Sequence, residues 1–205
     1  MPSQAKAGAY HHGDLRKALL DAAEAELAEK GLEGFTLRGC AKRAGVSHAA
    51  PAHHFKDANA LLTALAAVGH ERFAAAMQKR QAAATSARGR LIAAGLGYLD
   101  FARANPGLFR LMFSSQRPDY SDPGLAACGF RSFSVLTDAV RDLTGADPFK
   151  DKTAMLDAMG AWSIAHGLAH LLLAGQLPIA TEGNPDATYA AIIGRALPGS
   201  NRRGE

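Results

Sequence analysis

Three histidines lie within seven positions of the stretch AGVSHAAPAHHF, which runs from Ala44 to Phe55. They are His48, His53 and His54. An imidazole can both donate and accept hydrogen bonds, so these side chains could bind base edges or phosphates. The alanines between them carry little bulk, which would let a nucleic acid come close to the backbone amides. The chemistry that this stretch indicates is nucleic-acid recognition.

Basic residues concentrate around the same stretch. The net charge of the whole chain is only +4, which a surface of mixed sign would produce without any polyanionic partner. Between Thr36 and Lys56, however, there is no acidic residue. The bases in that interval are Arg38, Lys42, Arg43 and Lys56. This local pattern favours an anionic partner.

Two short helices would have to position these residues. Thr36 is expected to cap a helix that ends at Gly45, and Ser47 to cap a second helix that ends near Phe55. Because proline has no N–H to donate, Pro51 fits only if Ser47 lies at or before the start of that second helix. Two short helices joined by a tight glycine turn form a helix-turn-helix, whose second helix enters the major groove of DNA. The alternative is an ordinary helical hairpin with surface histidines.

Aromatic residues and methionines cluster in two later segments. The first segment, DFARANPGLFRLMF, is broken at Pro106, and the second, AMGAWSIAHGLAH, places Trp162 and His166 on one helical face. Such residues can enclose an adaptable apolar pocket, or they can simply fill a core. The residues expected to bind a small-molecule effector are Phe101, Phe109, Met112, Phe113, Met159, Trp162 and His166.

His166 and His170 are four residues apart, a spacing that can bring two imidazoles to one metal ion. The glutamate of the HExxH signature does not follow His166, and the sequence identifies no third ligand. A pair of this kind usually belongs to a core or a pocket. The sequence therefore does not favour a metal site.

An enzyme and a helical adaptor are the competing classes of protein. The sequence has no GxSxG motif, no phosphate-binding glycine loop and no conspicuous pair of carboxylates, so it gives no support for catalysis. An adaptor would explain the apolar C-terminal helices but not the basic segment without acids. We expect no enzymatic activity and no cofactor.

The remaining sequence predicts an all-α protein, because valine, isoleucine and threonine rarely form alternating runs. Two cysteines, Cys40 and Cys128, are expected to be reduced core residues. No apolar run is long enough for a membrane span and the start has no apolar signal core, which predicts a cytoplasmic protein. Further helices are expected over residues 14–30, 57–84, 87–104, 107–115, 125–143, 152–177 and 187–197.

The segment FTLRGCAKRAGVSHAAPAHHFKDANALLTAL resembles the DNA-binding segment of the TetR family of bacterial transcriptional regulators. Together with the preceding helix, the resemblance covers about residues 10 to 66. Ala52 departs from the pattern, because family members commonly carry an aromatic residue there. The resemblance implies that Lys56 lies near a phosphate and that the other DNA contacts are Arg38, Ser47, His48, Ala49, Ala50, Ala52, His53 and His54.

The later segment is similar to the Trp-His-Gly type of TetR C-terminal domain, through Trp162, His166 and Gly167. The expected organisation is a helix-turn-helix domain over residues 1–60 and a helical ligand-binding and dimerisation domain over residues 61–205. One helix-turn-helix reads few base pairs, so a homodimer on a pseudo-palindromic double-stranded operator is expected. The predicted dimer surface is the helix over 152–177 with the final helix, and the family's commoner mode of action is repression.

Overall fold

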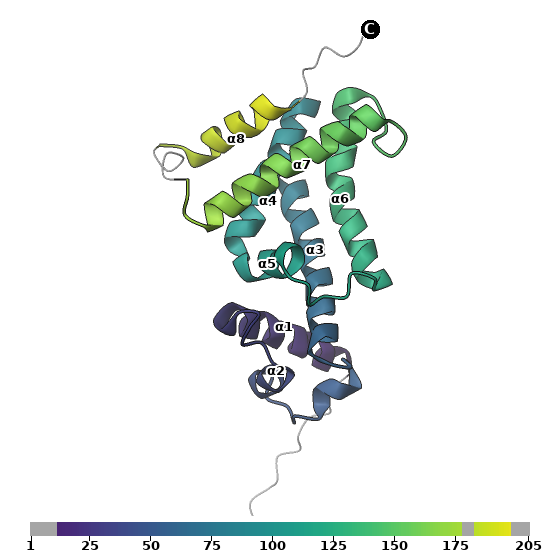
Figure 1. Cartoon of the computed structure of the whole chain (residues 1–205), viewed down its shortest axis with the longest axis vertical. Coiled ribbons are helices and arrows are strands. Elements are labelled where there is room, and N and C mark those ends of the chain that lie inside the picture. Colours follow the sequence, from purple (N-terminus) through teal and green to yellow (C-terminus); the bar gives the residue numbers. More distant parts are fainter. Residues whose placement is uncertain (1–11, 178–182, 198–205) are drawn as a thin grey trace, which may run out of the picture.

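The computed structural model describes residues 12–177 and 183–197, which are helical apart from their connections (Figure 1). No strand occurs in these two ranges, and the all-α prediction is confirmed. Nor is any of the described helices long and apolar enough to cross a membrane. The helices in chain order are α1 (His12–Lys30), α2 (Leu37–Arg43), the 3-10 helix η1 (Ala50–His53), α3 (Ala58–Gln81), α4 (Ala87–Ala104), α5 (Pro106–Ser114), α6 (Pro123–Thr144), α7 (Lys152–Leu173) and α8 (Pro185–Ala196).

Capping side chains set several of the helix starts. The side chains of Asp57, Ser86 and Asp151 accept hydrogen bonds from backbone N–H groups three residues on, at 2.8, 3.0 and 2.8 Å. Each bond satisfies an amide that the first helical turn leaves without a partner. Pro106 starts α5 where the sequence predicts a break, because a proline is tolerated in a first turn.

Two predicted helix ends lie too far along the chain, and the first is that of the helix expected over 57–84, which ends at Gln81. The helix expected over 152–177 ends at Leu173, because Gly175 adopts a left-handed conformation with φ of +67°. The N–H groups of Gly175 and Gln176 donate back to the carbonyls of Leu172 and Leu171 at 3.1 and 2.9 Å. These two bonds close the helix in the usual glycine-terminated way.

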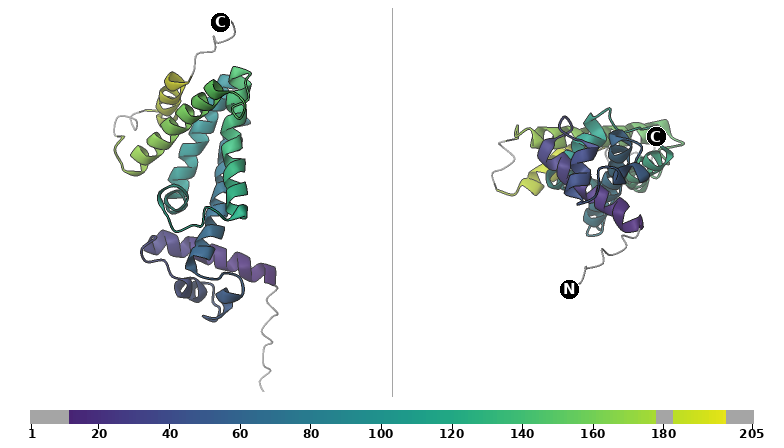
Figure 2. Two further views of the ribbon diagram at one scale, coloured as in Figure 1. Left: turned by 45° about the vertical axis from the view of Figure 1, so that its right-hand side comes forward. Right: turned by 90° about the horizontal axis from the view of Figure 1, so that it is seen from below.

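The helices form a small end and a larger bundle (Figure 1). α1, α2 and η1 lie together at the small end, and α1 crosses the base of α3 (Figure 2). α3 runs from there into the bundle, where α4 and α6 pack along it and α7 and α8 pack against α4. α3 is thus the main connection between the two ends.

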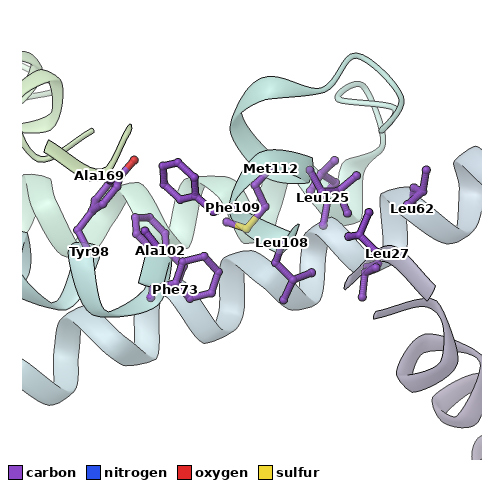
Figure 3. Packing of buried hydrophobic residues seen from close by; sticks show 14 of the residues in the cluster. Leu27, Leu62, Phe73, Tyr98, Ala102, Leu108, Phe109, Met112, Leu125 and Ala169 are labelled. Atoms are coloured by element: carbon purple, nitrogen blue, oxygen red, sulfur yellow. The ribbon is translucent and has the colours of Figure 1, made fainter. Parts of the chain in front are cut away.

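The apolar core is continuous along α3. Figure 3 shows Leu27 of α1, Leu108 and Met112 of α5 and Tyr98 of α4 in one row of buried side chains. The expected domain boundary at residue 60 falls in the first turn of α3. Apolar contacts therefore cross that position, and no flexible linker separates the two ends.

Candidate functional site

The tight turn of the helix-turn-helix follows α2. Thr36 Oγ1 accepts a hydrogen bond from the N–H of Gly39 at 3.0 Å, so the predicted cap is confirmed. After α2, Gly45 has a φ of +70°, a conformation that favours glycine. The N–H of Val46 donates to the carbonyl of Ala41 at 3.1 Å, which closes the turn.

The second helix is shorter than predicted, and its expected cap at Ser47 is wrong. η1 begins at Ala50 and ends at His53, with Ala49 at the N-cap position and no side-chain cap. Pro51 cannot donate to the carbonyl of Ser47, which instead accepts from the N–H of Ala50 at 3.0 Å. The segment therefore winds as a 3-10 turn, with the backbone N–H of His54 donating to the carbonyl of Pro51 at 2.9 Å.

All nine predicted DNA contacts lie at the small end of the molecule, on α2, on η1 or next to it (Figure 1). Two of them, Ala50 and His54, are half-buried. Buried Pro51 and Phe55 anchor the segment, and the guanidinium of Arg16 lies 5.6 Å from the centre of the Phe55 ring. The exposed contacts are Arg38, Ser47, His48, Ala49, Ala52, His53 and Lys56.

The basic residues at this end have two different roles. Arg43 donates to Glu26 Oε2 at 3.2 and 3.1 Å and also to Glu29, so it joins α2 to α1. These hydrogen bonds, to Glu29 first and then to Glu26, raise the pKa of Arg43. Within the described residues, Arg38, Lys42 and Lys56 form no ion pair. Their charges face solvent, where a phosphate backbone could meet them.

A surface groove of about 390 Å³ lies where α5, the loop 115–122 and α7 meet. Its wall includes five of the seven predicted effector-binding residues. The other two, Phe101 and Phe109, are buried in the core. Phe109 lies behind the wall, with its ring centre 5.1 Å from that of Phe113. The groove is lined by Met112, Phe113, Ser115, Gln116, Tyr120, Met159, Trp162, Ser163 and His166.

Trp162 also borders a second hollow. An apolar cavity of about 40 Å³ lies between α3, α4, α6, α7 and α8. Tyr98, Phe133 and Ile193 are among the residues that line this cavity. Trp162 is thus a lining residue shared by the cavity and the groove.

His166 is one of the polar residues that line the groove. The phenolic oxygen of Tyr98 lies 2.7 Å from His166 Nδ1, and Nε2 of His166 lies 3.1 Å from Nε2 of His170. Burial lowers the pKa of His166, and the neighbouring His170 lowers it further. Burial raises the pKa of Tyr98, so its hydroxyl stays protonated.

The loop 115–122 connects the groove to the small end. Arg117 donates to the carbonyl of Leu32 at 2.7 Å and to Asn59 Oδ1 at 3.1 Å. Its guanidinium also lies 5.7 Å from the centre of the Phe35 ring. We call this set of contacts the Arg117 clasp. The same loop supplies Ser115, Gln116 and Tyr120 to the wall of the groove.

Comparisons with known proteins agree with this geometry. A family model described as "Bacterial regulatory proteins, tetR family" matches residues 19–65, and one described as "Tetracyclin repressor-like, C-terminal domain" matches residues 91–196. The second match alone covers more than half of the chain. The chain belongs to the TetR family. The resemblance seen in the sequence is thereby confirmed, whereas the Trp-His-Gly type of C-terminal domain stays a prediction.

Solved structures of TetR-like fold extend the comparison. A protein of unknown function from Rhodococcus sp. RHA1 is 33% identical, with a TM-score of 0.75 over 92% of this chain and 98% of the other. A TetR family regulator from Marinobacter aquaeolei VT8 is 18% identical, with a TM-score of 0.64 over 89% and 95% of the two chains. The multidrug binding protein EbrR, solved with imidazole, is 18% identical, with a TM-score of 0.61 over 92% and 98%. No curated protein sequence matches the chain significantly.

Sequence reasoning on this TetR-family chain missed Arg117 and Tyr98. Arg117 lies in a loop, where no helical periodicity singles it out, and Leu32 is 85 positions away. Tyr98 follows the pattern of a core residue, and only the fold brings its hydroxyl to His166, 68 positions later. Neither contact leaves a local signal in the sequence.

Proposed function

We propose that the protein is a ligand-responsive repressor that binds a pseudo-palindromic operator as a homodimer. Membership of the TetR family makes it a DNA-binding transcription regulator, and the family and its structural neighbours point to a protein without enzymatic activity. The observation that carries the proposal is the exposed surface around α2 and η1, which presents small side chains and basic side chains that form no ion pair with any described residue. The nine predicted contacts at this surface are our proposed DNA-binding residues.

A mobility-shift titration with DNA from upstream of the protein's own gene tests this part of the proposal. Saturable binding that competitor DNA of random sequence does not abolish is expected. Arg38→Ala and His53→Ala should each change the preferred bases, at a cost of about 1–3 kcal/mol at the preferred site. Arg131, an exposed arginine on α6, supplies the matched control, and Arg131→Ala should bind normally. Unchanged base preference in both test variants would mean that residues other than Arg38 and His53 recognise the bases.

Homodimer formation is supported by an uncovered face of α7. Leu156 is 62% exposed on this face, and Leu171 is 41% exposed. Between them, Gly160 and Gly167 have open space where a side chain would project. Two copies of this helix could therefore pack closely, with α8 beside them. This is the pairing that two helix-turn-helix units need in order to read two half-sites.

Sedimentation of Gly160→Arg and Leu156→Glu tests the dimer surface. Both substitutions place charge on an exposed face and leave the core of the protomer intact. The wild type is expected to sediment as a dimer and the two variants as monomers with weakened operator binding. Dimers that persist in both variants at low micromolar concentration would contradict this surface.

Ligand responsiveness is supported by the position of the groove. Its volume of about 390 Å³ and its mostly apolar wall suit a small organic molecule. A protein with the same fold, EbrR, is described as a multidrug binding protein and was solved with imidazole. A ligand in the groove would press on the loop 115–122, which carries the Arg117 clasp. Displacing that loop would free the small end to move relative to the bundle and separate the two reading surfaces.

A thermal-shift screen of small molecules, followed by release from the operator, tests the groove. A ligand must bind the state that cannot bind DNA more tightly, since equal affinity for both states shifts nothing. Met159→Ala and Trp162→Phe should weaken induction, whereas Phe130→Ala, an exposed aromatic residue outside the groove, should leave it intact. Normal induction in both groove variants would reject the effector site and leave the DNA-binding proposal standing.

A further inference from the structure

We infer that His166 and His170 form a binding site for a transition-metal ion of the Cu²⁺ class. Their Nε2 atoms lie 3.1 Å apart on successive turns of α7, and their ring centres are 4.5 Å apart. The spacing of the two histidines in the sequence permits such a site but does not by itself indicate one. The 3.1 Å approach of the two Nε2 atoms is the new observation.

The separation fits two nitrogens bound to one ion. With metal–nitrogen bonds of about 2.0 Å, ligands at right angles lie about 2.8 Å apart and tetrahedral ligands about 3.3 Å apart. The observed 3.1 Å lies between these values. An ion could therefore take the place of the proton between the two Nε2 atoms, and that proton would move to Nδ1 of His170.

His166 is already oriented for this role. Its Nδ1–H can donate to the hydroxyl of Tyr98 at 2.7 Å, which leaves the Nε2 lone pair directed at His170. The rings of Phe109, Phe113 and Trp162 lie 5.7, 5.5 and 6.0 Å from the His166 ring and restrict its rotation. A hydrogen-bonded outer partner of this kind fixes the tautomer and orientation of a metal-binding histidine. His170 is exposed, so an ion can reach the pair from solvent.

The ligand set indicates which ion binds. Among residues 12–177 and 183–197, no third histidine, cysteine or carboxylate joins the pair. Water must then complete the coordination, giving two nitrogens and several oxygens. Tetragonal sites of nitrogen and oxygen suit Cu²⁺ and Ni²⁺, and Cu²⁺ binds more tightly of the two. Mg²⁺ and Ca²⁺ prefer oxygen ligands throughout.

The fluorescence of Trp162 provides a local test. It is the only tryptophan in the chain, and its ring lies 6.0 Å from that of His166, so bound Cu²⁺ should quench it. Chelator-treated protein is titrated with Cu²⁺, and with Mg²⁺ as the negative control. We expect quenching that saturates at one Cu²⁺ per chain. His170→Gln should raise the Cu²⁺ concentration for half-quenching by at least about ten-fold.

His53→Gln is the matched control, because His53 is also exposed but lies at the other end of the molecule. It should titrate as the wild type does. Electron paramagnetic resonance of the Cu²⁺ protein should show two coordinated nitrogens in the wild type and one in His170→Gln. Equal titrations of the wild type and His170→Gln would overturn the site, as would an equal loss in His53→Gln. The experiment uses no DNA or effector, so its outcome is independent of the proposed function.

Discussion

The two ends of this TetR-family chain obtain their stability in different ways. At the small end, α2 has 7 residues and η1 has 4, lengths at which an isolated helix does not persist in water. A cap, a glycine turn, the Arg43 ion pairs and the anchors Pro51 and Phe55 hold them. In the bundle, helices of 18 to 24 residues bury a broad aromatic core. A few buried or paired residues thus maintain the shape of the small end, and its exposed side chains have little part in holding it together.

The largest expected effect concerns packing in the bundle. A Cβ added at Gly97 of α4 would lie 2.6 Å from Met77 Cα and from the carbonyl oxygen of Ala76, both backbone atoms of α3. Because backbone cannot move aside as a side chain can, Gly97→Ala should lower the free energy of unfolding by about 3 kcal/mol. Urea unfolding followed by circular dichroism measures this change.

Gly129→Ala is the control for that substitution. Gly129 also lies within a helix, and the nearest atom to an added Cβ is His70 Cε1 at an ordinary 3.9 Å. Its free energy of unfolding should stay within about 1 kcal/mol of the wild type, with helix propensity favouring alanine. Equal unfolding midpoints for the two variants would contradict the close approach of α3 and α4.

A pH effect of intermediate size is expected from His70, also in the bundle. Burial lowers the pKa of His70 from 6.5 to about 4, and its Nδ1 lies 2.9 Å from Ser132 Oγ. Below pH 6.5 the unfolded chain binds a proton that the folded protein does not, so stability falls until His70 also titrates near pH 4. After allowance for partial solvent exposure, the loss should reach about 2 kcal/mol.

His70→Asn keeps a donor for Ser132 and removes the titration. Urea unfolding of this variant between pH 7 and pH 4 should show a shallower loss of stability than the wild type. Parallel pH profiles for the two proteins would assign the acid sensitivity to other groups.

A smaller effect is expected at the DNA-binding end. Arg43→Gln removes the charge that partners the buried carboxylate of Glu26, which should lower the free energy of unfolding by a measurable amount. Hydrogen exchange should quicken most in α2, because Arg43 joins α2 to α1. Arg72→Gln breaks a more exposed pair with Glu24 and should cost no more than about 0.5 kcal/mol. If hydrogen exchange in Arg43→Gln became faster by the same factor over the whole chain, the small end would not unfold separately from the bundle.

The smallest effect on folding is expected for Lys56→Ala. Lys56 is exposed, so the free energy of unfolding should not change measurably. As a proposed phosphate contact, Lys56 should contribute equally to all DNA sequences. Its loss should lower by about one the slope of the logarithm of the binding constant against the logarithm of the salt concentration. Fluorescence anisotropy with specific and random duplexes at several salt concentrations measures this. A selective loss on the specific duplex would instead make Lys56 a base-reading residue.

Local signals in the sequence predicted the fold well. Thr36 and Pro106 set helix starts where expected, because caps and prolines act on their own first turn. The same local chemistry explains the error at Ser47: the missing N–H of Pro51 shifts the helix start to Ala50 and produces a 3-10 turn. The sequence therefore predicted where helices occur better than whether a helix is an α-helix or a 3-10 helix.

The groove was predictable only in part. Periodicity placed Met159, Trp162 and His166 on one face of α7, and the groove contains all three. The same reasoning could not separate Phe113, which lines the groove, from Phe109, which lies behind it, because both are apolar residues of α5. Which face of a short helix meets a cavity depends on tertiary packing, which a single sequence does not encode locally.

The Arg117 clasp bears on hybrid proteins in which the DNA-binding end of one regulator is joined to the bundle of another. Its bond to Leu32 is made to a main-chain carbonyl, which any residue at that position would offer. Its other partners, the amide of Asn59 and the ring of Phe35, are side chains. A hybrid that joins another regulator's DNA-binding end to this bundle would keep the first contact but lose the others unless it also carried these two residues. If the groove is the effector site, as we propose, such a hybrid should still bind its operator but should no longer release it when a ligand occupies the groove.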